Sequence, residues 1–240
     1  MIEVRRANER HHDRVRTQEV WSTFQPTETG GAITAGFGTL EALTEDRLPP
    51  GAGIQRRPNR DADIITYVHE GKLTHVDSLG HSATVHACEF HRVTVRSGVR
   101  HSETNASRTD WAHVFQIWLR PSVDGLAAGQ EQKRFSTTQR RGSLCVIASP
   151  DRRGGSLLLH QDALMLSGVL DPGQHVVHEL APKRTAWLHL VGGEATIDGV
   201  VLKIGDGAGI TGERAVSFTA IHPTEVILLD LGELQGPVGN

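Results

Sequence analysis

Short apolar or alternating segments, each ended by a turn signal, recur along this chain and limit the folds that it can adopt. They occupy residues 64–68, 114–119, 156–160, 186–191 and 225–230. Residue pairs that contain glycine, such as Glu70-Gly71 and Gly192-Gly193, separate such segments. The chain has 26 glycines in all. Strands about 8–12 residues apart, divided by turn residues, are typical of β-sandwiches and β-barrels. We therefore expect an all-β fold, with short helices confined to linkers.

The same order of turns and strands occurs twice. Residues 35–120 and residues 145–232 each run through a Pro-Gly turn, a strand, a Gly turn and further strands. A length of 240 residues is sufficient for two separate hydrophobic cores. This repetition predicts two jelly-roll β-barrels, in residues 1–125 and 145–234. We expect a linker at 126–144 and a flexible tail at 235–240.

Composition and charge narrow the cellular setting. No apolar run approaches the roughly 18 residues of a membrane helix, and the first six residues lack the apolar segment of a secretory signal. The net charge of −3 provides no basic field for nucleic acid. Two cysteines, Cys88 and Cys145, cannot form a disulfide framework. We expect a cytoplasmic protein, as a monomer, with neither membrane nor nucleic acid as a direct partner.

One short segment carries a recognisable chemical pattern. After the turn at Gly98, His101 and Glu103 lie two residues apart on an expected strand, so both side chains point to the same face. An imidazole beside a carboxylate inside a barrel is half of a divalent metal site. A hydrogen-bonded polar pair at a barrel mouth is the alternative interpretation of the same spacing.

Several segments resemble the pirin family of the cupin superfamily, which includes bacterial proteins similar to quercetin 2,3-dioxygenase. They are residues 5–10, 63–71, 75–80, 98–105, 115–121, 147–150 and 205–208. The resemblance spans nearly the whole chain and implies a bicupin, with two barrels in one chain. It also implies that the N-terminal barrel holds iron or another divalent metal and that the C-terminal barrel holds none.

The chain departs from this family at two expected ligands. Family members have His-Pro-His where this chain has Arg57-Pro58-Asn59, while the later pair remains as His101 and Glu103. Arginine offers no lone pair to a metal, and an asparagine oxygen is a weak ligand for iron or copper. We expect a degenerate site in which His101 and Glu103 bind Fe, Cu, Ni or Zn at low occupancy, if at all. An Arg57–Glu103 ion pair would replace the metal, with Asn59 and His101 around it.

Other polar residues have a structural and a functional interpretation. Four further histidines, His69, His75, His86 and His91, are interpreted as outward-facing, although one inward ring would supply a replacement ligand. The arginines around the expected mouth form either a solvated rim or a pocket for a small anion; they are Arg56, Arg57, Arg60, Arg92, Arg96 and Arg100. In the second half, His175 and His178 are three residues apart and should face opposite sides of a strand, so we expect structural roles for them.

These observations leave two main functional hypotheses. The first is a pirin-like protein with a degraded metal site, which binds a small, anionic ligand or a partner without redox catalysis. The alternative is a metal-dependent oxidoreductase of the quercetin 2,3-dioxygenase type, as the resemblance implies. A third hypothesis, a transcriptional cofactor, rests on analogy with eukaryotic relatives and on no residue of this chain.

Overall fold

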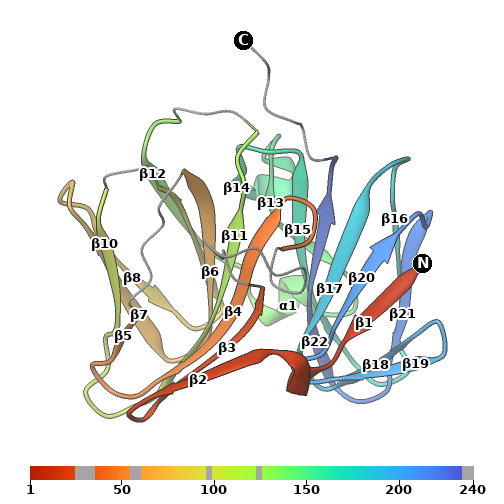
Figure 1. Ribbon diagram of the computed structural model, residues 1–240, viewed down its shortest axis with the longest axis horizontal. Helices are drawn as coiled ribbons and strands as arrows, with labels where there is room; N and C mark the ends of the chain where they lie inside the picture. Colours follow the sequence, from red (N-terminus) through yellow and green to blue (C-terminus); the bar gives the residue numbers. More distant parts are fainter. Residues whose placement is uncertain (25–35, 55–60, 96–98, 123–125, 234–240) are drawn as a thin grey trace. The chain divides into compact units, whose positions relative to one another are not determined.

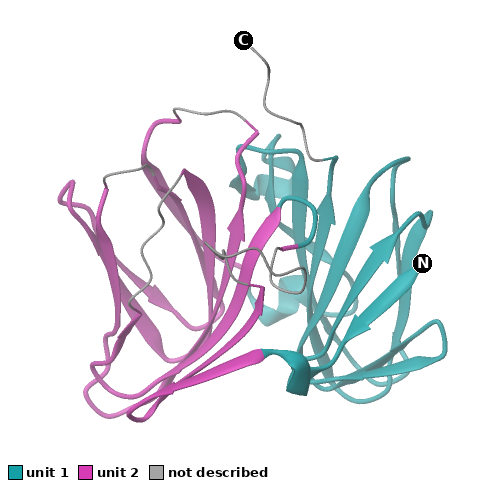
Figure 2. Cartoon of the chain, in the orientation of Figure 1, with its two compact units in different colours: residues 1–10, 37–39, 136–240 teal, residues 11–36, 40–135 magenta. Residues whose placement is uncertain are grey.

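The computed structural model describes residues 1–24, 36–54, 61–95, 99–122 and 126–233. In these ranges the chain consists mainly of β-strands, with one short α-helix and two 3-10 turns, so the all-β prediction is confirmed (Figure 1). The chain divides into two compact units (Figure 2). We call the unit with residues 11–36 and 40–135 the N-terminal barrel, and the unit with residues 1–10, 37–39 and 136–240 the C-terminal barrel.

The N-terminal barrel contains two antiparallel sheets. The larger has the strand order β12-β9-β6-β11-β4-β3-β2, and the smaller has the order β5-β10-β7-β8. The strands are β2 (His11–Val15), β3 (Gln18–Phe24), β4 (Leu40–Leu48), β5 (Gly53–Ile54), β6 (Ala62–Glu70), β7 (Lys72–Asp77), β8 (Ser82–His86), β9 (Glu89–Val95), β10 (His101–Asn105), β11 (Ala112–Leu119) and β12 (Gly129–Arg134). Strand β12 lies in the segment that we expected to be linker, and it pairs with β9.

The C-terminal barrel has the same division into a large and a small sheet. The orders are β1-β20-β17-β22-β15-β13-β14 and β16-β21-β18-β19. The strands are β1 (Ile2–Arg5), β13 (Cys145–Ser149), β14 (Leu157–Leu158), β15 (Ala163–Leu170), β16 (His175–Glu179), β17 (Thr185–Gly192), β18 (Glu194–Ile197), β19 (Val200–Lys203), β20 (Gly207–Thr211), β21 (Ala215–Ala220) and β22 (Thr224–Leu231). Because β1 pairs with β20, the first residues of the chain belong to this second barrel.

Short helical segments lie between strands. The helix α1 (Thr137–Arg140) begins after Ser136, whose hydroxyl accepts a hydrogen bond from the Gln139 amide, and two 3-10 turns cover Ala7–Glu9 and Arg153–Gly155. This placement agrees with the expectation that helices are confined to connections. No helix in the described part of the chain is long and apolar enough to cross a membrane.

Two glycine turns mark equivalent points in the barrels. Gly71 joins β6 to β7 and Gly193 joins β17 to β18, with φ near +78° and +79°. A Cβ at Gly71 would lie 2.6 Å from the Trp111 carbonyl oxygen, and one at Gly193 would lie 2.1 Å from that of Pro223. Both positions therefore require glycine for the left-handed backbone and for the close approach of another strand. They provide a reference from which positions in the two repeats can be matched.

Candidate metal centre

A layer of polar side chains crosses the interior of the N-terminal barrel. Along β6, Thr66 lies between Ile64 and Val68, which belong to two different apolar clusters. On the neighbouring strands, Gln116 and His91 are the register partners of Thr66. All of these side chains are buried. We define the polar layer as Thr66, His75, His91, Glu103 and Gln116.

The C-terminal barrel shows what the fold places at these positions when no polar layer is present. Thr66 lies five residues before Gly71, and Leu188 lies five before Gly193. Counting from the same glycines and following the strand register gives the remaining matches. The counterparts of Thr66, His75, His91, Glu103 and Gln116 are Leu188, Ile197, Ala208, Phe218 and Leu228. All five belong to one continuous apolar core. The fold therefore does not require the polar layer. Burying its polar side chains costs desolvation free energy, which bound ligand contacts would offset.

Three members of the layer converge on one point. Strands β7 and β10 place His75 directly opposite Glu103, and β9 contributes His91. One ligand atom from each of these three residues lies within 4.8 Å of the other two. His75 Nδ1 is 3.6 Å from Glu103 Oε1, beyond ordinary hydrogen-bond length, and the His75 and His91 ring centroids are 5.0 Å apart.

Hydrogen bonds from the surrounding strands hold this group in place. Thr66 donates its hydroxyl to Glu103 Oε1 over 3.2 Å, and the Gln116 amide donates to Glu103 Oε2. On the other side, His91 Nε2 lies 2.9 Å from Gln130 Oε1 on β12. Since an amide oxygen accepts, His91 Nε2 carries the proton and Nδ1 retains its lone pair. Such outer contacts are typical of metal sites, where they fix the orientation of the ligands.

The electrostatics of the layer favour the metal-binding protonation states. Burial alone would raise the pKa of the Glu103 carboxyl, but the surrounding imidazoles, led by that of His75, outweigh burial and lower the pKa. Burial lowers the pKa of His91, and the neighbouring His75 adds to this effect. A carboxylate beside an unprotonated imidazole is the state in which both groups can donate electron pairs to a cation.

His101 lies next to this group and is half-buried, whereas His75, His91 and Glu103 are buried. It is two residues before Glu103 on β10, as predicted, and its ring centroid is 5.7 Å from that of His75. Burial lowers the pKa of His101, although Glu103 acts in the opposite direction. The predicted placement of His101 and Glu103 on one strand agrees with the structure, but His101 is not among the three residues whose ligand atoms lie within 4.8 Å of one another.

The residues at 57 and 59 cannot be placed in the same way. Arg57 and Asn59 lie outside the described residues, so the Arg57–Glu103 ion pair stays a prediction. Glu103 nevertheless has Thr66, Gln116 and His75 around it, so the carboxylate is accommodated within the described residues. An isolated Glu103 charge was the physical reason for expecting an arginine, and that reason no longer holds.

Two of the other histidines were misjudged. His75 and His91 were interpreted as outward-facing, but both are buried in the polar layer. His86 is exposed at the end of β8, as expected of a surface histidine. The misjudged rings belong to different strands, so the spacing within one segment could not reveal their proximity. Their apolar counterparts Ile197 and Ala208 were the available signal.

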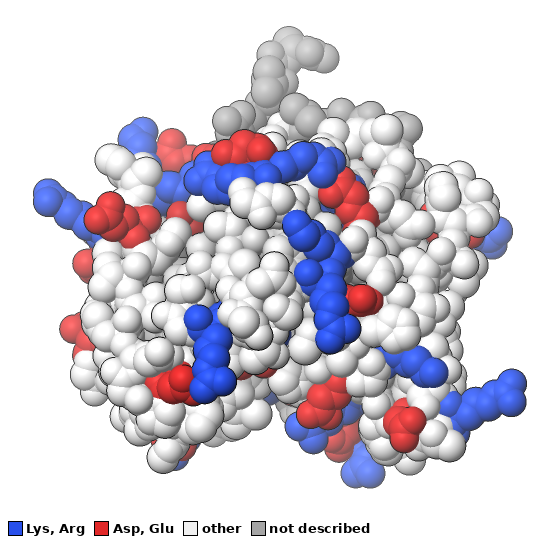
Figure 3. Space-filling view, turned by 180° about the vertical axis from the view of Figure 1, so that it is seen from behind, with Lys and Arg blue, Asp and Glu red and all other residues white. Residues whose placement is uncertain are grey.

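The proposed arginine rim also needs correction. Arg92 is buried on the face of β9 opposite to His91, where it donates to Thr94 and lies 2.8 Å from Glu131. It cannot contribute to an anion pocket in the polar layer, because adjacent strand residues point to opposite faces. Arg100 is exposed, and the other four arginines lie outside the described residues. On the face seen in Figure 3, basic side chains are interspersed with acidic ones.

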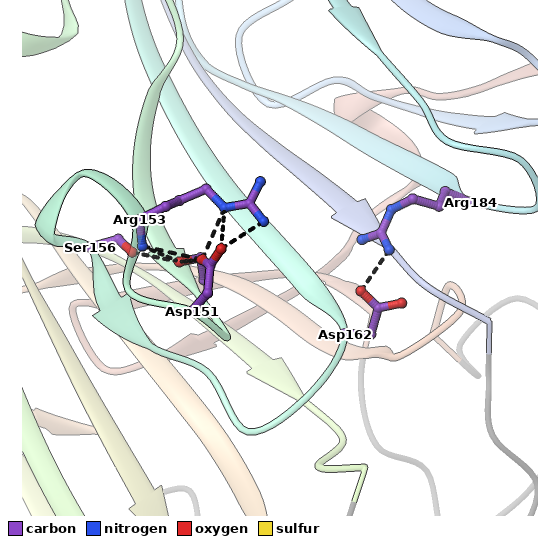
Figure 4. Close-up of polar contacts among 6 residues, drawn as sticks. Asp151, Arg153, Ser156, Asp162 and Arg184 are labelled. Atoms are coloured by element: carbon purple, nitrogen blue, oxygen red, sulfur yellow. Dashed lines mark hydrogen bonds and ion pairs between the residues drawn. The ribbon is translucent and has the colours of Figure 1, made fainter.

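The C-terminal barrel has a polar network of a different kind. Asp230 on β22 accepts from Arg184 and lies 2.8 Å from His178 Nε2. Arg184 also contacts Asp162 over 2.6 Å, and Asp151 pairs with Arg153 in a nearby loop (Figure 4). These acidic groups have cationic or imidazole partners close to them, as in a structural network. The predicted structural role of His178 agrees with this arrangement.

Comparison with known protein families identifies both barrels. Residues 3–119 match the Pirin family model, and residues 146–231 match the model of the quercetinase C-terminal cupin domain. A quercetin 2,3-dioxygenase of Escherichia coli O157:H7 is 38% identical over 231 residues, which cover 96% of this chain and 99% of that protein. The chain belongs to the pirin family. The predicted bicupin fold is thereby confirmed.

Solved structures of other pirins agree with this assignment. YhhW from Escherichia coli is 36% identical and superposes with a TM-score of 0.91, covering 98% of this chain and all of that chain. A second structure of this bacterial pirin, in complex with nickel(II), has a TM-score of 0.89 and covers 97% of this chain and all of that one.

The polar layer fits such a metal. Both ring nitrogens of His75 and the Nδ1 atoms of His91 and His101 are buried without a hydrogen-bond partner in the described structure. A buried nitrogen without a partner costs about 1–3 kcal/mol, and coordination to a cation would remove that cost. Together with an ionised Glu103, the nitrogens of His75 and His91 form a donor set suited to a divalent transition metal.

Proposed function

We propose that this pirin is a metal-dependent dioxygenase of the quercetin 2,3-dioxygenase type, which acts on flavonols. The observation that carries the proposal is the convergence of His75, His91 and Glu103 inside the N-terminal barrel, in a layer between two apolar clusters. The names of the relatives, which cover almost the whole chain, support this choice of reaction. Their names do not identify the physiological substrate of this protein, so quercetin is proposed as a representative of its class.

The alternative, a binding protein without redox catalysis, has less support. It followed from the replacement of two expected histidines by Arg57 and Asn59. The polar layer contains two other imidazoles, His75 and His91, which restore the number of nitrogen donors next to Glu103. A catalytic interpretation therefore no longer depends on residues 57 and 59.

The residues of the layer have distinct tasks in this proposal. A bound divalent metal would supply a Lewis-acidic position for the oxygens of a flavonol. Thr66 and Gln116 hold the Glu103 carboxylate in a fixed orientation, and the apolar clusters on both sides of the layer keep water away from it. His101 is more exposed than His75, His91 and Glu103, so we place the approach of the planar substrate on its side.

Turnover of quercetin under oxygen tests this function. Protein loaded separately with iron(II), nickel(II) or copper(II) should remove the flavonol absorbance, and mass spectrometry with ¹⁸O₂ should find both oxygen atoms in the product. The Glu103→Gln variant should lose this activity, while His86→Ala, at an exposed position, should retain it. A protein that binds metal stoichiometrically but leaves quercetin unchanged would refute the proposed substrate class.

A further inference from the structure

We propose that His75, His91 and Glu103 form a three-ligand metal centre with an open coordination position, and that Arg57 and Asn59 are not needed for it. This inference rests on the metal dependence of the proposed function, but not on its substrate. It assigns the ligand role to two strands, β7 and β9, which contribute one histidine each. The carboxylate comes from β10.

Atom separations in the layer match those of ligands that share a metal. Nitrogen and oxygen ligands lie about 2.1 Å from a zinc-sized ion, so two of them at a tetrahedral angle are about 3.4 Å apart. His75 Nδ1 and Glu103 Oε1 are 3.6 Å apart. This separation exceeds a hydrogen bond and agrees with a pair that faces a common cation.

The hydrogen bond of His91 determines which of its nitrogens faces the metal. Its Nε2 proton is directed at Gln130 Oε1, and its Nδ1 atom is buried without a hydrogen-bond partner in the described structure. A metal-bound histidine usually donates its second N–H to a fixed acceptor in this way. Gln130 therefore presents the Nδ1 lone pair of His91 to the centre, and we assign Nδ1 as the ligand atom.

Ring positions agree with two imidazoles on one metal. Two imidazoles bound to one tetrahedral metal have ring centroids about 5 Å apart, given nitrogen–metal bonds of about 2.1 Å. The His75 centroid is 5.0 Å from that of His91. The His101 centroid lies 5.7 Å from that of His75, and His101 is not among the three residues whose ligand atoms lie within 4.8 Å of one another.

The donor set determines the class of metal. Two imidazoles with one carboxylate favour iron(II), nickel(II), copper(II) or zinc(II). Calcium and magnesium prefer a shell of oxygen ligands, which this layer does not offer. In the C-terminal barrel, the five positions equivalent to the polar layer hold apolar residues. We therefore expect one such metal per chain.

Metal content and the visible spectrum of the cobalt(II) form test the ligand set. The wild-type protein should bind about one nickel(II) or cobalt(II) per chain, and cobalt(II) should show the strong absorption of a tetrahedral site. His75→Ala and His91→Ala should each weaken binding by more than the roughly 10–100-fold that loss of an outer contact causes. The conservative variants His75→Asn and His91→Gln, checked by circular dichroism, separate loss of a ligand from loss of folding.

The double variant Arg57→Ala/Asn59→Ala provides the decisive comparison, with His86→Ala as the control for histidine number. Both should bind metal as the wild type does. Loss of metal from the double variant, or wild-type binding in folded His91 variants, would overturn the inference. If the ligand variants behave as expected but quercetin is not consumed, the ligand assignment stands and the proposed function fails.

Discussion

At the scale of single residues, the hydrogen bond between His91 and Gln130 orients the His91 ring in the proposed metal centre. The Gln130 carbonyl holds the ring hydrogen of His91 on Nε2 and leaves Nδ1 available. His75 differs from His91, because its approach to Glu103 over 3.6 Å, rather than an outer hydrogen bond, defines which of its ring nitrogens faces the carboxylate. Gln130 is thus a positioning residue, which acts on the centre through His91.

Replacement of Gln130 tests this positioning role. Gln130→Ala should weaken nickel(II) binding about 10–100-fold, as is typical for loss of an outer-shell partner, while the protein remains folded. Competition with a chelator of known affinity measures the change. Gln132→Ala is the matched control, since Gln132 lies two residues further along β12 and contacts Glu89 and the Thr84 carbonyl instead. Equal affinities in the two variants would show that Gln130 does not orient His91.

At the scale of strands and turns, the glycine between β6 and β7 sets the position of the layer. Thr66 precedes Gly71 and His75 follows it, so a change in this turn would shift both strands against each other. The backbone at Gly71 combines a positive φ with a close approach to the Trp111 carbonyl. Gly51 has a similar φ of +72° but no heavy atom within 4 Å of the position of a Cβ.

This pair of glycines allows conformational strain to be separated from steric overlap. Gly51→Ala should cost about 1–2 kcal/mol of unfolding free energy, because an L-residue is strained in the left-handed region. Gly71→Ala should cost about 2–4 kcal/mol, since overlap with a neighbouring strand is added to the same strain. Urea denaturation followed by tryptophan fluorescence would measure both. Equal losses would mean that the turn at Gly71 can move away from Trp111.

The strands also show how far the sequence alone could lead. Alternation along one strand was sufficient to bring His101 and Glu103 together, because only local geometry was required. His75 and His91 join them through β-sheet pairing between distant segments, which no local pattern specifies. The twofold repeat did contain the missing information, since His75 and His91 stand where the second repeat has Ile197 and Ala208. The pairing of β1 with β20 was likewise not apparent from local periodicity.

At the scale of the whole molecule, the two barrels share one arrangement of sheets but differ in the residues of their interiors. In the N-terminal barrel the polar layer lies between two apolar clusters, whereas the equivalent positions of the C-terminal barrel belong to one continuous core. Asp230 in the second barrel is a buried charge that Arg184 and His178 compensate. Acid should therefore affect the two units through different groups, and a change at Asp230 should leave metal binding in the N-terminal barrel intact.

The pH dependence of stability follows from the pKa of Asp230. Burial alone would raise this pKa, but the contacts with His178 and Arg184 outweigh burial and lower it. An unfolded aspartate has a pKa of about 3.9, so the contribution is complete above that pH and is lost as the pH falls through the lower pKa of the folded state. Asp230→Asn should thus cost about 3 kcal/mol of unfolding free energy at neutral pH, because Arg184 and His178 lose their partner. It should also flatten the decline in stability below about pH 4.

Asp162→Asn is the control: Asp162 is 67% exposed, and its ion pair with Arg184 should contribute less than about 1 kcal/mol. Denaturant unfolding from pH 7 to pH 3 measures both variants, and a slope below pH 4 that is as steep in Asp230→Asn as in the wild type would show that another carboxylate governs acid stability.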